Sequence, residues 1–249
     1  MDNAFTIAAY VVAAILFILS LGGLSGQESA KRAVWYGIAG MALAVFATLV
    51  GPGAGLGLLS IILIALGGMV GYQLATKVEM TQMPELVAIM HSMVGLAAVF
   101  VGFNADIMIN NMAALYEANG QVLGAVGPDG ITAIGLPKEA YDGLSAFGQL
   151  IAKKSSVEIS ILRVELVLGI WIGAVTFTGS VIAYAKLAGN SSKLPFKVDT
   201  GANKLPGGHF LNAGAAALSV ILLVMYMGGS GSWALVLLTL AGLFIGYHL

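Results

Sequence analysis

The chain contains no cysteine, and charged residues fill only 9% of its 249 positions. Without cysteine it can form no disulfide, thiolate nucleophile or cysteine-ligated metal centre. Its three histidines are scattered and match no H-E-x-x-H or similar ligand pattern, so the sequence predicts no metal site. The formal net charge of −1 gives no basic field, and we therefore expect no nucleic-acid partner.

The short motifs of hydrolytic and nucleotide-cleaving enzymes are also missing. No G-x-S-x-G, G-x-x-x-x-G-K-[ST] or paired-carboxylate arrangement is present, so the sequence predicts no catalytic residue. The alternating glycines at 51–57 resemble a phosphate-binding loop, but no strand precedes them. We interpret them as a tight turn between two helices.

Apolar residues are abundant: they make up 59% of the chain, and the mean hydropathy is +0.94. Soluble domains carry about 25% charged residues. Only helices and closed barrels satisfy their backbone groups within a bilayer, and a helix needs about 20 residues to cross it. We therefore predict an all-α, polytopic transmembrane helical bundle, forming one transmembrane domain over 1–249. It has about seven spans: 4–24, 34–50, 56–75, 83–103, 159–187, 210–227 and 232–249.

The basic residues of the short connections lie on one side of this seven-span path. The connections on the opposite side, 51–55 and 228–231, contain no lysine or arginine. Since cytoplasmic loops are enriched in these residues, we predict an N-terminus outside and a C-terminus in the cytoplasm. The seven residues that carry this bias are Lys31, Arg32, Lys77, Lys186, Lys193, Lys197 and Lys204.

A long segment, 104–158, separates the fourth and fifth predicted helices, and we expect it to be an extracytoplasmic insertion. Pro128-Asp129-Gly130 is typical of a turn, and Pro137 can begin a helix. That helix would lie on the outer surface, since it is amphipathic. Its apolar face would hold Ala140, Leu144, Phe147 and Ile151. A polar loop with no role of its own is the alternative interpretation.

His91 is the single ionisable group well inside the fourth apolar run. Polar groups at membrane depth are costly and usually face a bundle interior or a water-filled path. With Gly95, Ala98 and Gly102 it follows a helical spacing, so it shares a face with small residues that favour close helix packing. Histidine can take and release a proton near neutral pH. We predict a proton-handling role, the alternative being a neutral imidazole hydrogen-bonded to a neighbouring helix.

Glu85 follows Pro84 at the start of the same helix. A carboxylate in the first turn is favoured by the helix dipole. We prefer this explanation of Glu85 to a role in proton entry. Six residues separate Glu85 from His91, so the two side chains do not share a face.

The fifth predicted helix carries a second polar stripe. Gly169 and Gly173 form a small-xxx-small pair, so close packing explains much of it. Glu165 lies inside the outer interface and requires either pairing with Arg163 or a water-filled vestibule. The stripe consists of Glu165, Gly169, Gly173, Thr176 and Ser180.

Two long segments resemble a known family. They are K-V-E-M-T-Q-M-P-E-L-V-A-I-M-H-S-M-V-G-L-A-A-V-F-V-G-F-N at 77–104 and G-A-V-T-F-T-G-S-V-I-A-Y-A-K-L at 173–187. Both are similar, almost letter for letter, to the beta subunit of proton-translocating NAD(P) transhydrogenase. The likeness extends from the first helix to the last residue, although 104–158 is longer than we expect for the family.

The resemblance implies a function. In this family a hydride passes between NAD(H) on the alpha subunit and NADP(H) on a soluble domain of the beta subunit, while protons cross the membrane domain. His91 falls on the family's proton-relay histidine and Ser180 on a serine of the adjacent channel helix. Glu85 matches a carboxylate of the same motif. We add Glu165 and Thr176, from the stripe of Ser180, to the predicted proton pathway.

The resemblance also implies partners and a location. The family's beta subunit continues beyond the position of Leu249 with two more helices, one bearing a polar partner for the histidine, and an NADP-binding domain. We therefore expect this chain to bind no nucleotide itself. Expected partners are the alpha subunit, a second alpha-beta unit and the lipid of a bacterial cytoplasmic (inner) membrane. The alternatives are a self-contained proton-coupled secondary transporter and a structural subunit without conduction.

Overall fold

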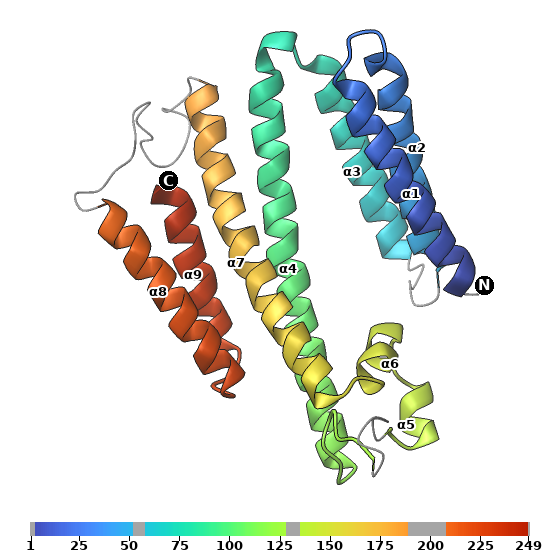
Figure 1. The fold of residues 1–249 in the computed structure, drawn as a ribbon, viewed down its shortest axis with the longest axis vertical. Coiled ribbons are helices and arrows are strands. Elements are labelled where there is room, and N and C mark those ends of the chain that lie inside the picture. Colours follow the sequence, from blue (N-terminus) through green and yellow to red (C-terminus); the bar gives the residue numbers. More distant parts are fainter. Residues whose placement is uncertain (1–2, 52–57, 128–134, 189–207, 249) are drawn as a thin grey trace. The chain divides into compact units, whose positions relative to one another are not determined.

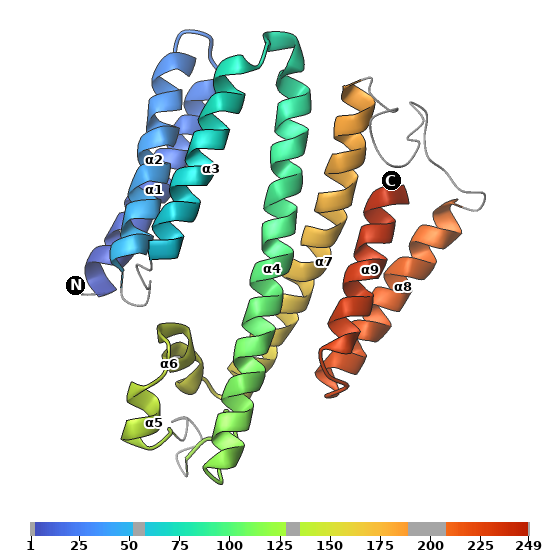
Figure 2. The same ribbon diagram turned by 180° about the vertical axis from the view of Figure 1, so that it is seen from behind.

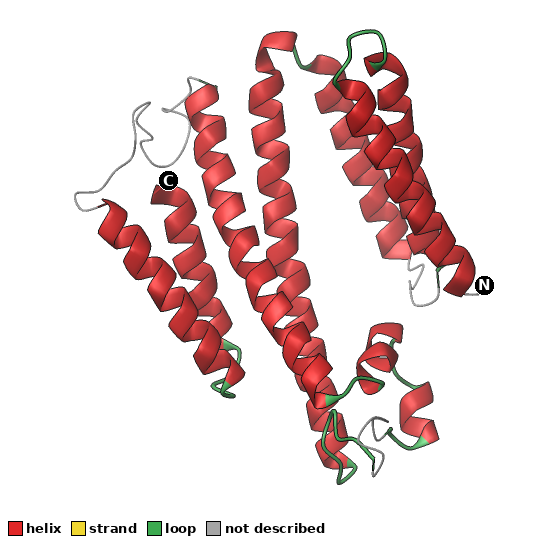
Figure 3. Cartoon of the chain, viewed as in Figure 1, coloured by secondary structure: helices red, strands yellow, loops and turns green. Residues whose placement is uncertain are grey.

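The computed structural model describes residues 3–51, 58–127, 135–188 and 208–248, and none of these forms a β-strand (Figure 3). Six of the described helices are long and apolar enough to cross a membrane, while α9 is shorter. All seven predicted spans are helical, so the predicted helical membrane bundle is confirmed. The helices are α1 Asn3–Leu24, α2 Ala30–Val50, α3 Leu58–Lys77, α4 Met83–Ala118, α5 Lys138–Asp142, α6 Ala146–Ala152, α7 Ser156–Leu187, α8 Gly208–Met227 and α9 Trp233–His248.

The chain divides into two compact units, and the first contains α1, α2 and most of α3. In this unit α1 packs along α2 through small side chains, with Ala13, Ala33 and Ala47 almost fully buried (Figure 1). One side-chain hydrogen bond joins the pair, between the Tyr10 hydroxyl and Thr48 Oγ1 at 2.9 Å. None of the described residues of α3 is buried, which leaves its whole surface for lipid or for other helices.

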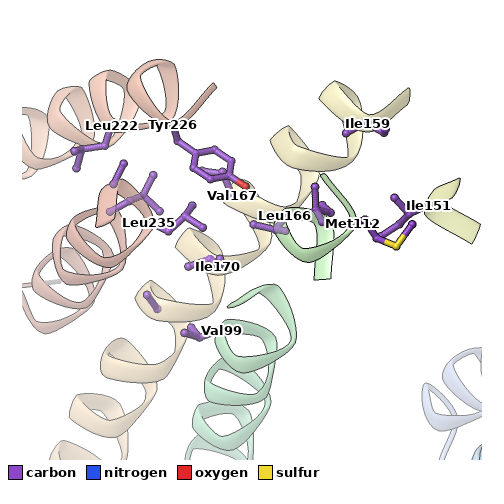
Figure 4. Packing of buried hydrophobic residues seen from close by; sticks show 14 of the residues in the cluster. Val99, Met112, Ile151, Ile159, Leu166, Val167, Ile170, Leu222, Tyr226 and Leu235 are labelled. Atoms are coloured by element: carbon purple, nitrogen blue, oxygen red, sulfur yellow. The ribbon is translucent and has the colours of Figure 1, made fainter. Parts of the chain in front are cut away.

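The second unit contains α4, α7, α8 and α9. Helix α7 lies between α4 and α9, and α8 packs against α9 (Figures 1 and 2). Its hydrophobic core gathers residues from all four helices, as the close view in Figure 4 shows for Val99, Ile170, Leu222 and Leu235. These four helices and the turn before α9 carry every side chain that we discuss below as a candidate site.

Helix α4 is longer than predicted and continues to Ala118, and the predicted end at Phe103 is wrong. The stretch 104–118 contains no glycine or proline, and its buried residues Ile109, Met112 and Tyr116 extend the apolar stripe. The helix stops where Asn119 is followed by Gly120, which adopts a left-handed φ of 68°. At 36 residues it spans about 54 Å, more than a ~30 Å hydrocarbon layer requires.

The described parts of the 104–158 segment are packed. The expected single amphipathic helix is replaced by two short ones, α5 and α6, because Gly143 ends the first. Ile151 is fully buried, whereas Phe147, predicted on the same face, is exposed. The Tyr116 hydroxyl donates to the Ala152 carbonyl at 3.1 Å and so fixes the end of α6 to α4. Whether this segment lies outside the cell stays a prediction.

Helix α7 begins three residues before the predicted start. Ser155 and Glu158 form a capping box: the Glu158 carboxylate accepts from the Ser155 backbone nitrogen at 2.8 Å, and Ser155 Oγ accepts from the Glu158 nitrogen. Several sequence predictions fall outside the described residues, namely the turns at 52–55 and 128–130 and the lysines at 193, 197 and 204.

Candidate functional site

Helices α4 and α7 run antiparallel and meet along a seam of small and polar residues, which we call the glycine seam: Ser92, Gly95, Val99, Gly102, Ile170, Gly173 and Phe177. Its α4 members recur at alternating steps of three and four residues, the spacing of a coiled-coil contact. The Ser92 hydroxyl crosses the seam and donates to the Phe177 carbonyl at 3.2 Å. Ser92 itself is completely buried.

The two backbones approach closely at Gly95 and Gly173. A methyl group added to Gly95 would lie 2.7 Å from both the Gly173 carbonyl oxygen and the Phe177 nitrogen. One added to Gly173 would lie 2.7 Å from the Gly95 carbonyl oxygen. A methyl group added to Gly102 would instead meet the side chain of Ile170. Only glycine fits at such a crossing, which is how small residues bring membrane helices together.

His91 lies on the flank of this seam, outside the contact. Ser92, one residue further on, occupies the buried position, and His91 is exposed within the chain. It has no hydrogen bond or ion pair with any described residue. Within the described residues the packed face of α4 follows 92, 95, 99 and 102, so His91 does not take part in the α4–α7 contact. That His91 lies at a packed helix interface stays a prediction.

Ser180 and Thr176 lie on the side of α7 that faces the His91 end of α4. A methyl group on Gly95 would lie 3.0 Å from Thr176 Cβ, so Thr176 borders the seam. Because the helices are antiparallel, one turn from Gly95 to His91 corresponds to one turn from Thr176 to Ser180. His91 and Ser180 therefore lie at the same level, and both Thr176 and Ser180 are half-buried.

The remaining predicted residues lie apart from this level. Glu85 is half-buried in the first turn of α4, beside Pro84. Glu165 is exposed, and no ion pair with Arg163 forms among the described residues. Gly169 faces open space, with nothing within 4 Å of an added methyl group, so it does not join Gly173 in the seam.

A second polar cluster, absent from our sequence predictions, surrounds Asp106. This carboxylate is completely buried. The Tyr226 hydroxyl donates to Oδ1 at 2.6 Å and the Ser232 hydroxyl to Oδ2 at 2.6 Å. Asn110 Nδ2 donates to Ser232 Oγ at 3.3 Å. Figure 4 shows the Tyr226 ring extending from α8 toward α7. We call these four residues, together with Arg163, the Asp106 cluster.

The tight turn between α8 and α9 positions Ser232. Gly229 and Gly231 adopt φ angles of 86° and 90°, a left-handed conformation that costs glycine little. This turn connects Tyr226 at the end of α8 to Ser232 before α9, so both hydroxyls reach the same carboxylate on α4. The predicted glycine turn at 228–231 thus has a further role in the cluster.

On its opposite side α7 contacts α9 through a second set of small residues. A methyl group on Gly242 would lie 2.9 Å from Ala174 Cβ, and Gly246 faces Thr178 and Val175. Thr178 Oγ1 lies 2.9 Å from the Leu243 carbonyl and also donates toward its own helix. Near the end of α9, His248 is buried beside Asn212, with Nδ1 2.9 Å from Oδ1.

No three histidine, aspartate or glutamate side chains in the described part of the chain come together as metal ligands would. A family model described as NAD(P) transhydrogenase beta subunit matches residues 6–249. The chain belongs to the NAD(P) transhydrogenase beta-subunit family. The predicted family is thereby confirmed.

Two curated transhydrogenase beta subunits illustrate the likeness. Both are named NAD(P) transhydrogenase subunit beta, one from Rhodospirillum rubrum and one from a specified strain of that species. Each is 39% identical over 189 residues, which cover 76% of this chain and 32% of the relative. The chain thus spans about a third of the length of the relatives that it matches.

The Asp106 cluster escaped prediction for a specific reason. Ending the fourth helix at Phe103 placed Asp106 in a polar loop, where an aspartate needs no explanation. The stripe from Gly95 through Gly102, continued by four residues, reaches Asp106. Extending the helix to the Asn119-Gly120 stop signal would have predicted a carboxylate on the packed face.

Proposed function

We propose that this chain is the proton-translocating membrane part of an NAD(P) transhydrogenase. Proton movement through its second unit is coupled to hydride transfer between NAD(H) and NADP(H) on soluble domains outside this chain. The observation that carries the proposal is the family match over 6–249 on a bundle of membrane-length helices. The chain works with an alpha subunit, as two alpha-beta units in a bacterial inner membrane.

In this proposal His91 is the group that takes and releases the proton. An exposed imidazole at membrane depth is costly in lipid, so we expect a further helix of the assembled complex to cover the His91 flank. Ser180, at the same level on α7, and Thr176 next to it offer hydroxyls that relay a proton along that flank. Glu85 at the helix start and the exposed Glu165 are accessory groups nearer the two surfaces.

A self-contained secondary transporter fits less well. Such proteins build midplane sites from interrupted helices. Helices α4 and α7 run without interruption for 36 and 32 residues. This continuity favours a proton path along the flank of a rigid helix pair and argues against a substrate-binding pocket.

The test is His91→Ala in the complete alpha-beta complex, reconstituted in liposomes with a pH-sensitive dye. We expect nucleotide-driven proton flux to fall by about tenfold or more, since the group that binds the proton is lost. Hydride exchange between the soluble domains should fall much less. The matched control is Met90→Ala, which truncates an exposed neighbour in the same turn. Proton flux in His91→Ala equal to wild type contradicts the proposal.

A further inference from the structure

The Asp106 cluster has no part in the pathway described above, yet it is a fully buried ionisable group in a membrane helix. Buried carboxylates in membrane segments are rare and usually functional. Its two hydroxyl partners come from α8 and from the turn before α9, and Arg163 of α7 lies within electrostatic reach of Tyr226. Polar groups from α8 and from the turn before α9 therefore meet at this carboxylate of α4, and the Arg163 charge of α7 acts on one of them.

Through Arg163 the cluster borders an open groove between the end of α4 and the start of α7, with both polar and apolar residues in its lining. The groove has a volume of about 470 Å³, and its polar lining includes Glu117, Gln121, Ser160 and Arg163. Two of its atoms, Gln121 Oε1 and Arg163 Nε, are buried without a hydrogen-bond partner among the described residues. Buried polar atoms in a roomy polar site are satisfied by water. The groove is thus a hydrated entrance, and Arg163 belongs both to it and to the Asp106 cluster.

The hydrogen bonds around Asp106 suit a group that changes protonation. Tyr226 and Ser232 donate to the carboxylate, but a hydroxyl can equally accept. When a proton binds Oδ2, the new O–H can donate to Ser232 Oγ, and the serine hydroxyl turns its own proton away. Both oxygens of Asp106 then keep a hydrogen bond in either state, without movement of a heavy atom. The charge of the cluster with Arg163 changes from zero to +1.

Asp106 and His91 lie on opposite sides of an apolar layer. Fifteen residues of α4 separate them, which is about 22 Å along the helix. Beyond Ser92 and Gly95, on the way to Asp106, the seam contains Val99, Gly102 and Ile170, none of which has a polar side chain. A proton path across a bilayer needs an accepting group on each side of such a layer, and His91 supplies only one.

From these observations we infer that Asp106 is a second proton-binding site, loaded from the hydrated groove at the end of the membrane domain opposite His91. Arg163 is a positioning residue, whose positive charge offsets the negative charge of the ionised Asp106. This inference rests on the proposed function, since it concerns the same proton movement.

Three variants test it in the complete complex in liposomes. Asp106→Asn keeps the shape and one acceptor oxygen but cannot bind a proton, so we expect proton flux to fall by about tenfold or more. Asp106→Glu keeps the acid and should retain at least about a third of the flux. Ile107→Ala, the matched control, truncates an exposed neighbour of Asp106 on the same helix and should leave the flux within about twofold of wild type. Melting temperatures in detergent monitor folding.

Several results would overturn the inference. Asp106→Asn flux within about twofold of wild type means that no proton binds there. Glutamate and asparagine variants that are equally impaired mean that the residue is only structural. If wild-type complex moves no protons, or His91→Ala moves them normally, the proposed function fails instead, so the two failures are distinguishable.

A measurement on the wild-type complex removes the dependence on variant folding. Hydrophobic carbodiimides react with protonated carboxyl groups, and peptide mass spectrometry locates the adduct. We expect modification at Asp106 that rises as the pH on the groove side falls. No adduct at Asp106 at any pH tested, with reaction at other carboxyl groups, also overturns the inference.

Discussion

The helix pairs α1–α2 and α4–α7 are both closely packed, but the residues at the two contacts differ. Both bring membrane helices together through small residues, but α1–α2 uses alanine side chains such as Ala13, Ala33 and Ala47. In α4–α7 the backbones themselves meet at Gly95 and Gly173. Fully buried polar groups, Ser92 and Asp106, occur on α4. The two pairs therefore differ in a way that parallels the proposed function. The helix pair with close backbone contact and buried polar groups, where larger residues do not fit, is the one along which protons are proposed to move.

The sharpest test of this contrast is Gly95→Ala. The added methyl group meets two backbone atoms at 2.7 Å, which cannot move aside as a flexible side chain would. We expect destabilisation of about 3 kcal/mol, at the upper part of the range for overpacking. Loss of the native melting transition in detergent, or a large fall in melting temperature, would be the readout.

Gly169→Ala is the matched control on the same helix pair. Nothing lies within 4 Å of its added methyl group, so the variant should melt at or slightly above the wild-type temperature, by up to about 1 kcal/mol of helix propensity. Equal melting temperatures for the two alanine variants would show that the α4–α7 contact is not close in the assembled protein.

A smaller effect is expected from Tyr226→Phe. The change removes a 2.6 Å hydrogen bond to a buried carboxylate and should cost about 2 kcal/mol, since hydrogen bonds to charged groups are worth about 1.5–3 kcal/mol. Thermal melting measures it. Tyr10→Phe, which removes the exposed hydrogen bond of the α1–α2 pair, is the control and should change stability by less than about 0.5 kcal/mol. If Tyr10→Phe lowered stability as much as Tyr226→Phe, the exposed and the buried hydrogen bond would contribute equally, and the contrast between the two pairs would not hold.

The smallest effect is expected from Gly40→Ala in the α1–α2 pair. Its added methyl group would lie 3.2 Å from both the Ala13 carbonyl oxygen and Leu16 Cβ, so a shift of a few tenths of an ångström suffices. Gain in helix propensity offsets part of that strain, and we expect stability within about 1 kcal/mol of wild type. Melting in the same detergent compares it directly with Gly95→Ala. A collapse as severe as that of Gly95→Ala would mean that both pairs are equally intolerant.

Much of the fold could be predicted because bilayer thickness constrains it. Apolar runs of about 20 residues specify spanning helices with little ambiguity. The glycines at 95, 102 and 173 were also predictable, because small residues at helical spacing favour close contact. It was harder to predict which of the adjacent residues His91 and Ser92 lies on the packed face of α4. A stripe of residues three and four apart can be drawn through either one. The burial of Ser92 and its hydrogen bond to the Phe177 carbonyl show that the seam passes through Ser92 and not through His91.

Other features depended on contacts between distant segments. Asp106 is separated along the chain from Tyr226 by 120 residues and from Ser232 by 126, and no local pattern joins it to them. Gly169 repeats the spacing of Gly173 but faces away from α4, since one sequence stripe drifts around a 32-residue helix. Sequence periodicity identifies faces, whereas the partner of each face is set by the tertiary fold.

The unbroken length of α4 has a mechanical consequence. A 36-residue helix is a stiff rod that carries a displacement from one membrane surface to the other without intervening hinges. A tilt of about 5° about its first turn moves its far end by about 5 Å. The helix carries His91 near one end and Asp106 toward the other. A small displacement of the short connection at Met80–Gln82 would therefore tilt the whole helix and reorient the His91 and Asp106 side chains together.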